Sequence, residues 1–340
     1  MKPAHLATWF FFVLAAACRP EVGPPISQIG GPAILAVKGV PAEVDPKSAN
    51  TTVAYEALAV DVAGRVPGPS ADITSPLLWA TCDQPKPPTE NNSVSSSCLD
   101  ESALPGIVGS SATTYSAPAP VDACSQFGPS TPQAAQGQPP IRPRDPDVTG
   151  GYYLPIRVEL LVPEELRRAA MTFPDSLVAF QLQRIYCGLA NASATDIRDY
   201  TANYKLNNNP LLTALTVGQP GLNPVELTIS SATVASVSVG RGQTIALWAY
   251  WSDDSAEPYL AFDVIQRMLV NHPRETMRVS WYATGGSFEH DITGRGENES
   301  ENYAQNTWKS DVAGLVHMWL VLHDIRGGTD FAAIDFNVTQ

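Results

Sequence analysis

The sequence predicts an all-β protein built from two β-sandwich domains, and three observations lead to that prediction. The chain of 340 residues is long enough for about two domains. Only 16% of its residues are charged, against about 25% in an average globular domain. Its 30 prolines among 340 residues are a larger share than the average usage of about 5%. Short alternations of apolar and polar residues recur between Gly- and Pro-containing turns, which is typical of sandwiches and barrels.

The amino terminus, MKPAHLATWFFFVLAAAC, has the organisation of an export signal. Lys2 supplies positive charge, and the apolar run at 6–14 is shorter than the roughly 20 residues that a membrane-spanning helix needs. The three alanines before Cys18 resemble the lipobox of bacterial lipoproteins, which implies that residues 1–17 are a signal peptide and that Cys18 is acylated. Ordinary secretion is the alternative. The Pro- and Gly-containing region 18–32 is then expected to be a flexible, lipid-anchored tether.

The first domain is expected to span residues 33–203. Its predicted strands are 33–40, 53–62, 77–82, 152–162 and 177–189, with a short helix at 163–171. In the second of these strands, Leu58, Val60 and Val62 alternate with smaller or polar residues, so we expect a half-buried strand with one face in solvent.

Residues 83–150 break the pattern of alternation. This segment contains twelve prolines and no sustained hydrophobic period, so we interpret it as a long loop insertion without regular structure. It could be a binding loop, but a tolerated, solvated insertion is favoured. The polar, Asn-rich stretch 191–209 is interpreted as the linker between the domains.

The second domain is expected to span residues 204–340. Its predicted strands are 211–217, 225–229, 232–239, 244–251, 277–284, 315–323 and 331–338. The strand at 315–323 has one wholly apolar face. His317 and His323 lie on its other face, which we expect to meet solvent.

Four cysteines remain besides the one at the anchor: Cys82, Cys98, Cys124 and Cys187. An even number in an exported chain suggests two disulfides. Four cysteines allow three pairings and the sequence does not choose among them; Cys82–Cys98 with Cys124–Cys187 is our working guess. The closest pair is sixteen residues apart in the sequence, which argues against a zinc site.

No constellation for catalysis stands out, and the chain is therefore predicted not to be an enzyme. The formal net charge of −13 argues against nucleic acid as a partner. His290, between two acidic residues, is the first candidate for an alternative in which distant residues assemble a hydrolase site. Acidic runs at 253–257 and 297–301 offer oxygen atoms to calcium but lack the spacing of an EF-hand loop. We predict no cofactor and no metal.

Trp79 and Trp281 each lie on a predicted strand. Ala-Thr follows Trp79 directly and follows Trp281 after one intervening residue. A central Trp resembles the core of immunoglobulin-like domains, which implies two Greek-key sandwiches, although neither region has the usual bridging cysteine pair. The motifs AAAC, PAEVDP, LLWATC, SWYATGGSF and LHDIRGG are together similar to those of uncharacterised lipoproteins of Gram-negative bacteria. That resemblance implies a location in the cell envelope, with the outer membrane expected, and no known activity.

These observations favour a non-catalytic binding, adhesion or structural module. The membrane is its expected partner through acylated Cys18, and a protein or polysaccharide of the envelope is the other. A further alternative is that the sandwiches are spacers that present the insertion 83–150 as the binding element.

Overall fold

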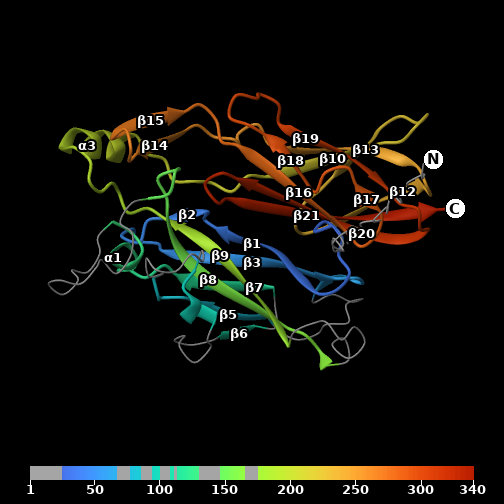
Figure 1. Cartoon of the computed structure of the whole chain (residues 1–340), viewed down its shortest axis with the longest axis horizontal. Helices are drawn as coiled ribbons and strands as arrows, with labels where there is room; N and C mark the ends of the chain where they lie inside the picture. The colour runs from blue at the N-terminus through green and yellow to red at the C-terminus, as the bar shows by residue number, and fades with distance from the viewer. Residues whose placement is uncertain are drawn as a thin grey trace, which may run out of the picture.

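A computed structural model describes residues 25–66, 77–85, 94–99, 108–110, 113–129, 146–164 and 175–340 (Figure 1). The predicted signal peptide, Cys18 and most of the helix expected at 163–171 lie outside these residues. Within them, no helix combines the length and the apolar character needed to cross a membrane.

The first sandwich has two sheets. Its strands are β1 (Ala33–Val40), β2 (Glu43–Val44), β3 (Thr52–Asp61), β4 (Gly64–Val66), β5 (Leu77–Thr81), β6 (Val108–Ser110), β7 (Thr114–Pro118), β8 (Tyr152–Leu161) and β9 (Ser176–Ile185). One sheet has the order β1-β3-β4, with β7 also paired to β3, and the other has the order β2-β9-β8-β5-β6.

The second sandwich repeats this plan. Its strands are β10 (Leu212–Gly218), β11 (Val225–Thr228), β12 (Val234–Gly240), β13 (Thr244–Trp251), β16 (Met277–Ala283), β17 (Ser287–Phe288), β18 (Ile292–Arg295), β19 (Tyr303–Lys309), β20 (Gly314–Asp324) and β21 (Thr329–Thr339). The sheet orders are β11-β10-β13-β19-β17 and β12-β21-β20-β16-β18. A separate hairpin is formed by β14 (Tyr259–Asp263) and β15 (Met268–His272).

The two sandwiches share one strand order. In each, the last strand lies between the strand before it and a short parallel strand: β9 between β8 and β2, and β21 between β20 and β12. The other ladders are antiparallel. The prediction of an all-β chain with two immunoglobulin-like Greek-key sandwiches is therefore confirmed. Trp79 and Trp281 are both completely buried, each in the core of its own sandwich.

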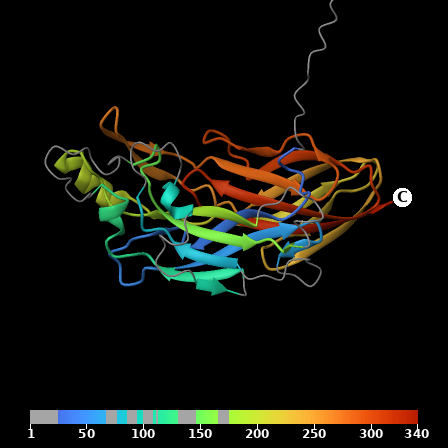
Figure 2. The ribbon, with the colours of Figure 1, turned by 60° about the horizontal axis from the view of Figure 1, so that its bottom comes forward.

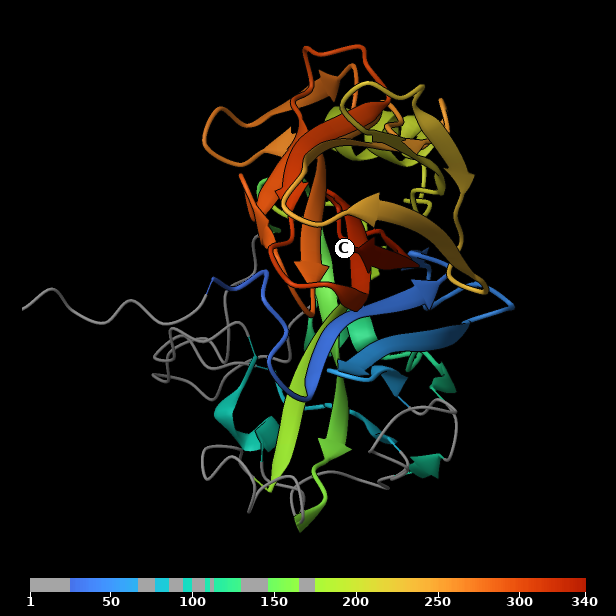
Figure 3. The same cartoon turned by 90° about the vertical axis from the view of Figure 1, so that its right-hand side faces the viewer.

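The two sandwiches stack face to face (Figure 3). On β3, Ala57 and Ala59 point into the first core, whereas Leu58 and Val60 pack against Trp319 and other residues of the second sandwich. The expectation of a half-buried strand was thus wrong: the face of Ala57 and Ala59, expected to meet solvent, lies in the first core, and the apolar face of Leu58 and Val60 is covered by the neighbouring sandwich. The same contact between the sandwiches corrects the expectation that the second face of β20 meets solvent, because Trp319 on that face is buried.

The segment 83–150 is not a structureless insertion. Its described part contains a 3-10 turn η1 (Ser96–Leu99), the strands β6 and β7, and a short helix α1 (Ala123–Gln126). Strand β7 joins the first sheet through β3, and Ala117 and Ala123 enter the first core. The small residues of this segment carry too little hydrophobic contrast to reveal the pairing, which depends on partners distant in sequence.

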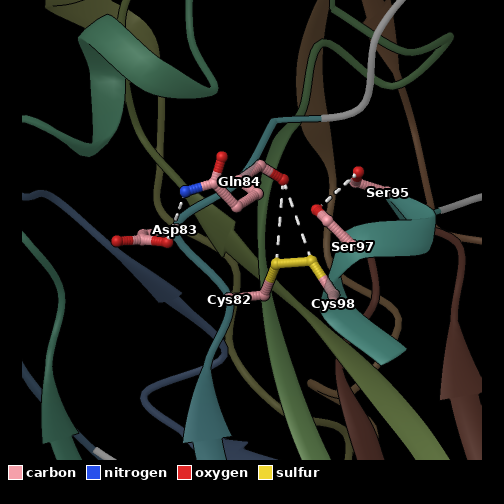
Figure 4. Close-up of a disulfide and its surroundings, with 6 residues drawn as sticks. All are labelled: Cys82, Asp83, Gln84, Ser95, Ser97 and Cys98. Atoms are coloured by element: carbon pink, nitrogen blue, oxygen red, sulfur yellow. Dashed lines mark hydrogen bonds between the residues drawn. A yellow bond between two sulfur atoms is a disulfide. The ribbon is translucent and has the colours of Figure 1, made fainter. Parts of the chain in front are cut away.

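Two disulfides tie this segment to the first sandwich. Cys82, just after β5, pairs with Cys98 of η1, and the carbonyl of Gln84 lies beside both sulfur atoms (Figure 4). Cys124 of α1 pairs with Cys187, which follows β9. These are the two pairs taken as the working guess.

The stretch 191–209, interpreted as a linker, contains the helix α3 (Ala194–Asn203). Ser193 caps this helix by accepting a hydrogen bond from the backbone N–H of Asp196, a cap that the sequence S-A-T-D permits. Tyr200 of α3 is buried, so this region packs on the body instead of spanning freely between the sandwiches.

The described part of the expected tether is also docked. Gln28 forms a parallel bridge with Ala283, and Ile29 is buried against the interface between the sandwiches. Residues 25–32 are therefore not a flexible tether, because a backbone pair and an apolar side chain hold them to β16.

Candidate binding site at the junction of the two sandwiches

Charged side chains are buried where the two sandwiches meet beside α3. We call this set the junction network; its members are Glu43, Arg184, Tyr204, Asn207, Glu257, Glu275, Asp324 and Arg326. Both arginine side chains have zero exposure. Burial of a charge costs several kcal/mol unless partners compensate it, so each of these groups needs its neighbours.

Arg184, on β9, connects the first sandwich to the loop before β8. Its Nε lies 3.3 Å from Oε1 of Glu43. Nη1 donates to Thr149 Oγ1 at 2.7 Å and to the Tyr153 hydroxyl at 3.0 Å, and Nη2 donates to the Thr149 carbonyl at 3.0 Å. Burial lowers the pKa of Arg184, but Glu43 and the surrounding hydroxyls outweigh it and hold that pKa above its usual value.

Glu43 connects Arg184 to the segment that follows α3. It accepts hydrogen bonds from the Tyr204 hydroxyl at 2.7 Å and from the Asn207 backbone N–H at 2.8 Å. The Asn207 side chain in turn donates to both oxygens of Asp324, at 3.3 and 3.2 Å. A continuous chain of polar contacts thus runs from β2 to the end of β20.

Arg326 is the corresponding residue of the second sandwich. Its Nε forms an ion pair with Glu275, its Nη2 lies 3.3 Å from Glu257, and its guanidinium carbon lies 5.2 Å from the centre of the Tyr259 ring. The pKa of Glu275 is raised to about 8, mainly by burial and also by nearby Asp324, while Arg326 opposes the shift. Arg326 therefore holds the start of β14 in place.

A pocket of about 310 Å³ opens beside the junction network. Its lining is mostly apolar and comes from both sides of the junction: Pro146, Asp147, Val148, Ala261, Phe262, Asp263, Val264, Ile265, Val270 and His272. One wall is the loop before β8, and the other is the hairpin of β14 and β15. Its volume is at the lower end of the range for ligand sites in proteins, about 300–1,000 Å³.

The junction network fixes both walls of this pocket. On one side, Arg184 holds Thr149, whose N–H and hydroxyl both donate to Oδ1 of Asp147, at 2.9 and 2.7 Å. On the other side, the ring of Tyr259, beneath Arg326, stacks on His272 with a centroid distance of 4.5 Å and an interplanar angle of 7°. Nδ1 of His272 lies 2.9 Å from Glu297.

The rim of the pocket is apolar and exposed. Ile265 at the hairpin tip is 90% exposed and Val148 on the opposite wall is 88% exposed, while Val264 beside Ile265 is 41% exposed. Single exposed apolar residues are common on proteins, but several around one concave site are typical of a contact surface.

The residues singled out earlier for chemistry do not assemble. The side chain of His290 is 62% exposed and lies 3.9 Å from Glu289. Over the described ranges, no three His, Cys, Asp or Glu residues are grouped as metal ligands. In the acidic runs, Asp253 binds Asn302, and Glu299 accepts from the N–H of Gly296.

His317 and His323 do not face solvent as expected. His317 Nδ1 lies 2.7 Å from Asp335, and Gly64 of the first sandwich lies over its ring. The pKa of His323 is lowered to about 4, mainly by burial and also by nearby Arg278. The reason is again the stacking of the two sandwiches, which covers this face of β20.

Sequence reasoning missed the junction network, although two of the motifs quoted for the lipoprotein resemblance contain its members. PAEVDP contains Glu43, and LHDIRGG contains Asp324 and Arg326. The signal in the sequence that could have indicated the network was a charged residue inside or beside an apolar strand. The partners that these charges meet across the junction lie between 51 and 164 residues away, so the sequence could not show that they are buried together.

Comparison with known proteins leaves the family open. No family model matches the chain, and no curated protein matches it. Among solved structures, the fibronectin(III)-like modules of Clostridium thermocellum CbhA are similar at a TM-score of 0.23 and 9% identity, over 91% of this chain and 94% of that one. The D0-D1 domain of intimin gives 0.21 and 9%, over 90% and 99%. Dimeric latent PorU of Porphyromonas gingivalis gives 0.20 and 11%, over 92% and 24%.

Proposed function

We propose that this chain is a non-catalytic binding module of a bacterial cell envelope, anchored by lipid on Cys18, which holds a partner at the pocket between its two sandwiches. The observation that carries the proposal is the construction of that pocket. One wall is the loop that enters β8 of the first sandwich, the other is the hairpin inserted between β13 and β16 of the second sandwich, and a buried arginine fixes each wall. A site built this way is ordered before a partner arrives, which lowers the entropic cost of binding.

The exposed rim supports a protein partner. Val148 and Ile265 lie on opposite walls, and both present nearly all of their apolar surface to solvent. Contact with a partner would remove this surface from water, which contributes about 25 cal/mol per Å². The pocket between them would take a side chain or group that anchors the contact.

The position of the pocket fits an anchored protein. Gln28 pairs with Ala283 at one end of β16, and the hairpin leads into Met277 at the other end, about 20 Å away at 3.3 Å per residue. Figures 1 and 2 place α3 at one end of the molecule and the carboxyl-terminal end of β21 at the opposite end. An anchor shortly before residue 25 would therefore leave the pocket facing away from the membrane.

The direct test is photo-crosslinking in the native host. A benzoylphenylalanine in place of Ile265 is compared with the same residue in place of Val312, which is 70% exposed in the turn after β19. We expect a discrete adduct from position 265 and none from 312.

Two further variants test whether the adduct depends on the pocket. Val148→Asp, on the opposite wall, is expected to abolish the adduct at 265, whereas Leu315→Asp, 54% exposed at the other end, leaves it intact. Equal adducts from 265 and 312, or an adduct insensitive to Val148→Asp, would contradict the proposed function.

A further inference from the structure

We infer that the pocket takes an extended peptide segment of a partner protein, in which a basic residue stands beside a large apolar one. This inference rests on the proposed binding function and specifies its ligand. Three features carry it: the size of the pocket, the charge of its lining and the surface around its mouth.

The size and lining of the pocket match one large apolar side chain. Its lining includes Ala261 and Phe262 of β14, both buried, together with Val270 of β15. A volume of about 310 Å³ accommodates an aromatic or branched aliphatic side chain with part of its backbone. It is too small for a large cofactor such as a dinucleotide.

The charge of the lining favours a basic residue in the peptide, next to the apolar residue that fills the pocket. Asp147 and Asp263 are among the lining residues, and no Lys or Arg is. Oδ1 of Asp263 accepts from the N–H groups of Ile265 and Gln266, both at 2.8 Å, whereas Oδ2 makes no hydrogen bond or ion pair within the described part of the chain. A cation placed beside the pocket would meet this oxygen in a partly desolvated site.

The surface around the mouth indicates a macromolecule. Val148 and Ile265 line the pocket and are nevertheless 88% and 90% exposed, so their apolar surface continues around its mouth. A small aromatic cation would fill the cavity and leave this rim in water. A peptide segment that continues on both sides of its anchoring residue would cover the rim as well.

The test uses three capped tripeptides and the purified full chain in phosphatidylcholine nanodiscs, labelled at Ile and Val methyl groups for NMR. The probes are acetyl-Lys-Phe-Lys-amide, acetyl-Glu-Phe-Glu-amide and acetyl-Lys-Ala-Lys-amide. We expect the first to shift the methyl resonances of Val148, Val264, Ile265 and Val270, with a dissociation constant of about 1 mM for so small a ligand. The other two should bind at least about tenfold more weakly.

A matched pair of variants locates the charge effect. Asp263→Asn keeps an oxygen for the two backbone N–H groups but removes the charge, and it should weaken the Lys-Phe-Lys probe about threefold to tenfold. Asp311→Asn makes the same change on a side chain that is 73% exposed at the other end of the molecule, and it should have no effect.

Other results overturn the inference. Equal binding of the Glu-Phe-Glu probe would remove the charge argument, and equal binding of Lys-Ala-Lys would reduce the contact to attraction by an acidic surface. Phenethylammonium binding as tightly as the peptide would make the ligand a small aromatic cation. If any of these occurs while the crosslink at position 265 persists, the proposed function stands and the ligand class is wrong. Loss of the crosslink refutes the function itself.

Discussion

Arg184 forms two hydrogen bonds with Thr149: its guanidinium donates to the Thr149 hydroxyl at 2.7 Å and to the Thr149 carbonyl at 3.0 Å. Arg184 belongs to β9, in the interior of the first sandwich, whereas Thr149 stands next to Val148 on the pocket wall. A loop residue is thereby tied to a rigid strand by two charge-assisted hydrogen bonds. Because the same guanidinium pairs with Glu43, the stability of the fold and the shape of the pocket depend on one side chain.

Removal of Arg184 should be costly. Arg184→Met leaves Glu43 as a buried, unpaired charge, so we expect the free energy of unfolding to fall by about 3–5 kcal/mol. Urea titration followed by circular dichroism measures this. Arg198→Met, whose side chain is 73% exposed and pairs with Asp199, is the matched control and should cost less than about 0.5 kcal/mol. Equal small losses in both variants would show that the network is not the support described above.

The two disulfides should contribute unequally. Cys82 and Cys98 close a loop of 16 residues, and Cys124 and Cys187 one of 63. In the chain-entropy account, removing the first bond costs about 3 kcal/mol and removing the second about 4 kcal/mol. Thermal unfolding of the two double Cys→Ala variants, each against the wild type, gives this order. The reverse order would mean that local packing outweighs loop length.

His323 should make the protein less stable in acid. The pKa of its folded form is about 4 against 6.5 for an exposed histidine, so the unfolded chain takes up a proton at a higher pH. Its contribution to the free energy of unfolding is complete above pH 6.5 and is lost as the pH falls toward 4. The total loss is limited to about 3 kcal/mol. His323→Gln should flatten the decline in unfolding free energy between pH 7 and 4. Because the prediction concerns the difference between the two proteins, the other titrating groups cancel. Parallel pH profiles for wild type and variant would contradict it.

The face of β3 that meets the second sandwich offers a test of the stacking. Leu58 is 1% exposed there, whereas Val62, one residue beyond the strand, is 50% exposed. Leu58→Ala should lower the free energy of unfolding by about 2–5 kcal/mol because it leaves a cavity between the sandwiches. Val62→Ala is expected to change it by less than about 1 kcal/mol, measured by the same titration. A loss below about 1 kcal/mol for Leu58→Ala would mean that the sandwiches do not pack as described.

The fold class could be predicted from the sequence because its signals are local. The alternation in 244–251 matches β13 over the same residues, and the Trp residues at 79 and 281 marked both cores. Elements without apolar contrast were missed, among them β7, which consists of TYSAP, and the hairpin that forms one wall of the pocket. Leu58 and Val60 could be recognised as the apolar face of β3, but nothing local showed that another sandwich covers this face while Ala57 and Ala59 lie in the first core.

The candidate site could not be predicted because it belongs to no single segment. Arg184 and Arg326 lie in separate sandwiches, and each depends on carboxylates from distant loops. The pocket lining likewise combines residues near 147 with residues near 265. Sequence reasoning named His290 as the first candidate of the hydrolase alternative because it stands between two acids, and its side chain is largely exposed to solvent.

The junction network should hold the two walls of the pocket at a fixed separation. Spin labels at Val148→Cys and Ile265→Cys, read by double electron–electron resonance with the native disulfides intact, measure that separation directly. We predict a single narrow distance distribution in the otherwise wild-type protein and a broad one when Arg184→Gln is added. A distribution that is already broad without Arg184→Gln, or one that the substitution leaves unchanged, would contradict the account.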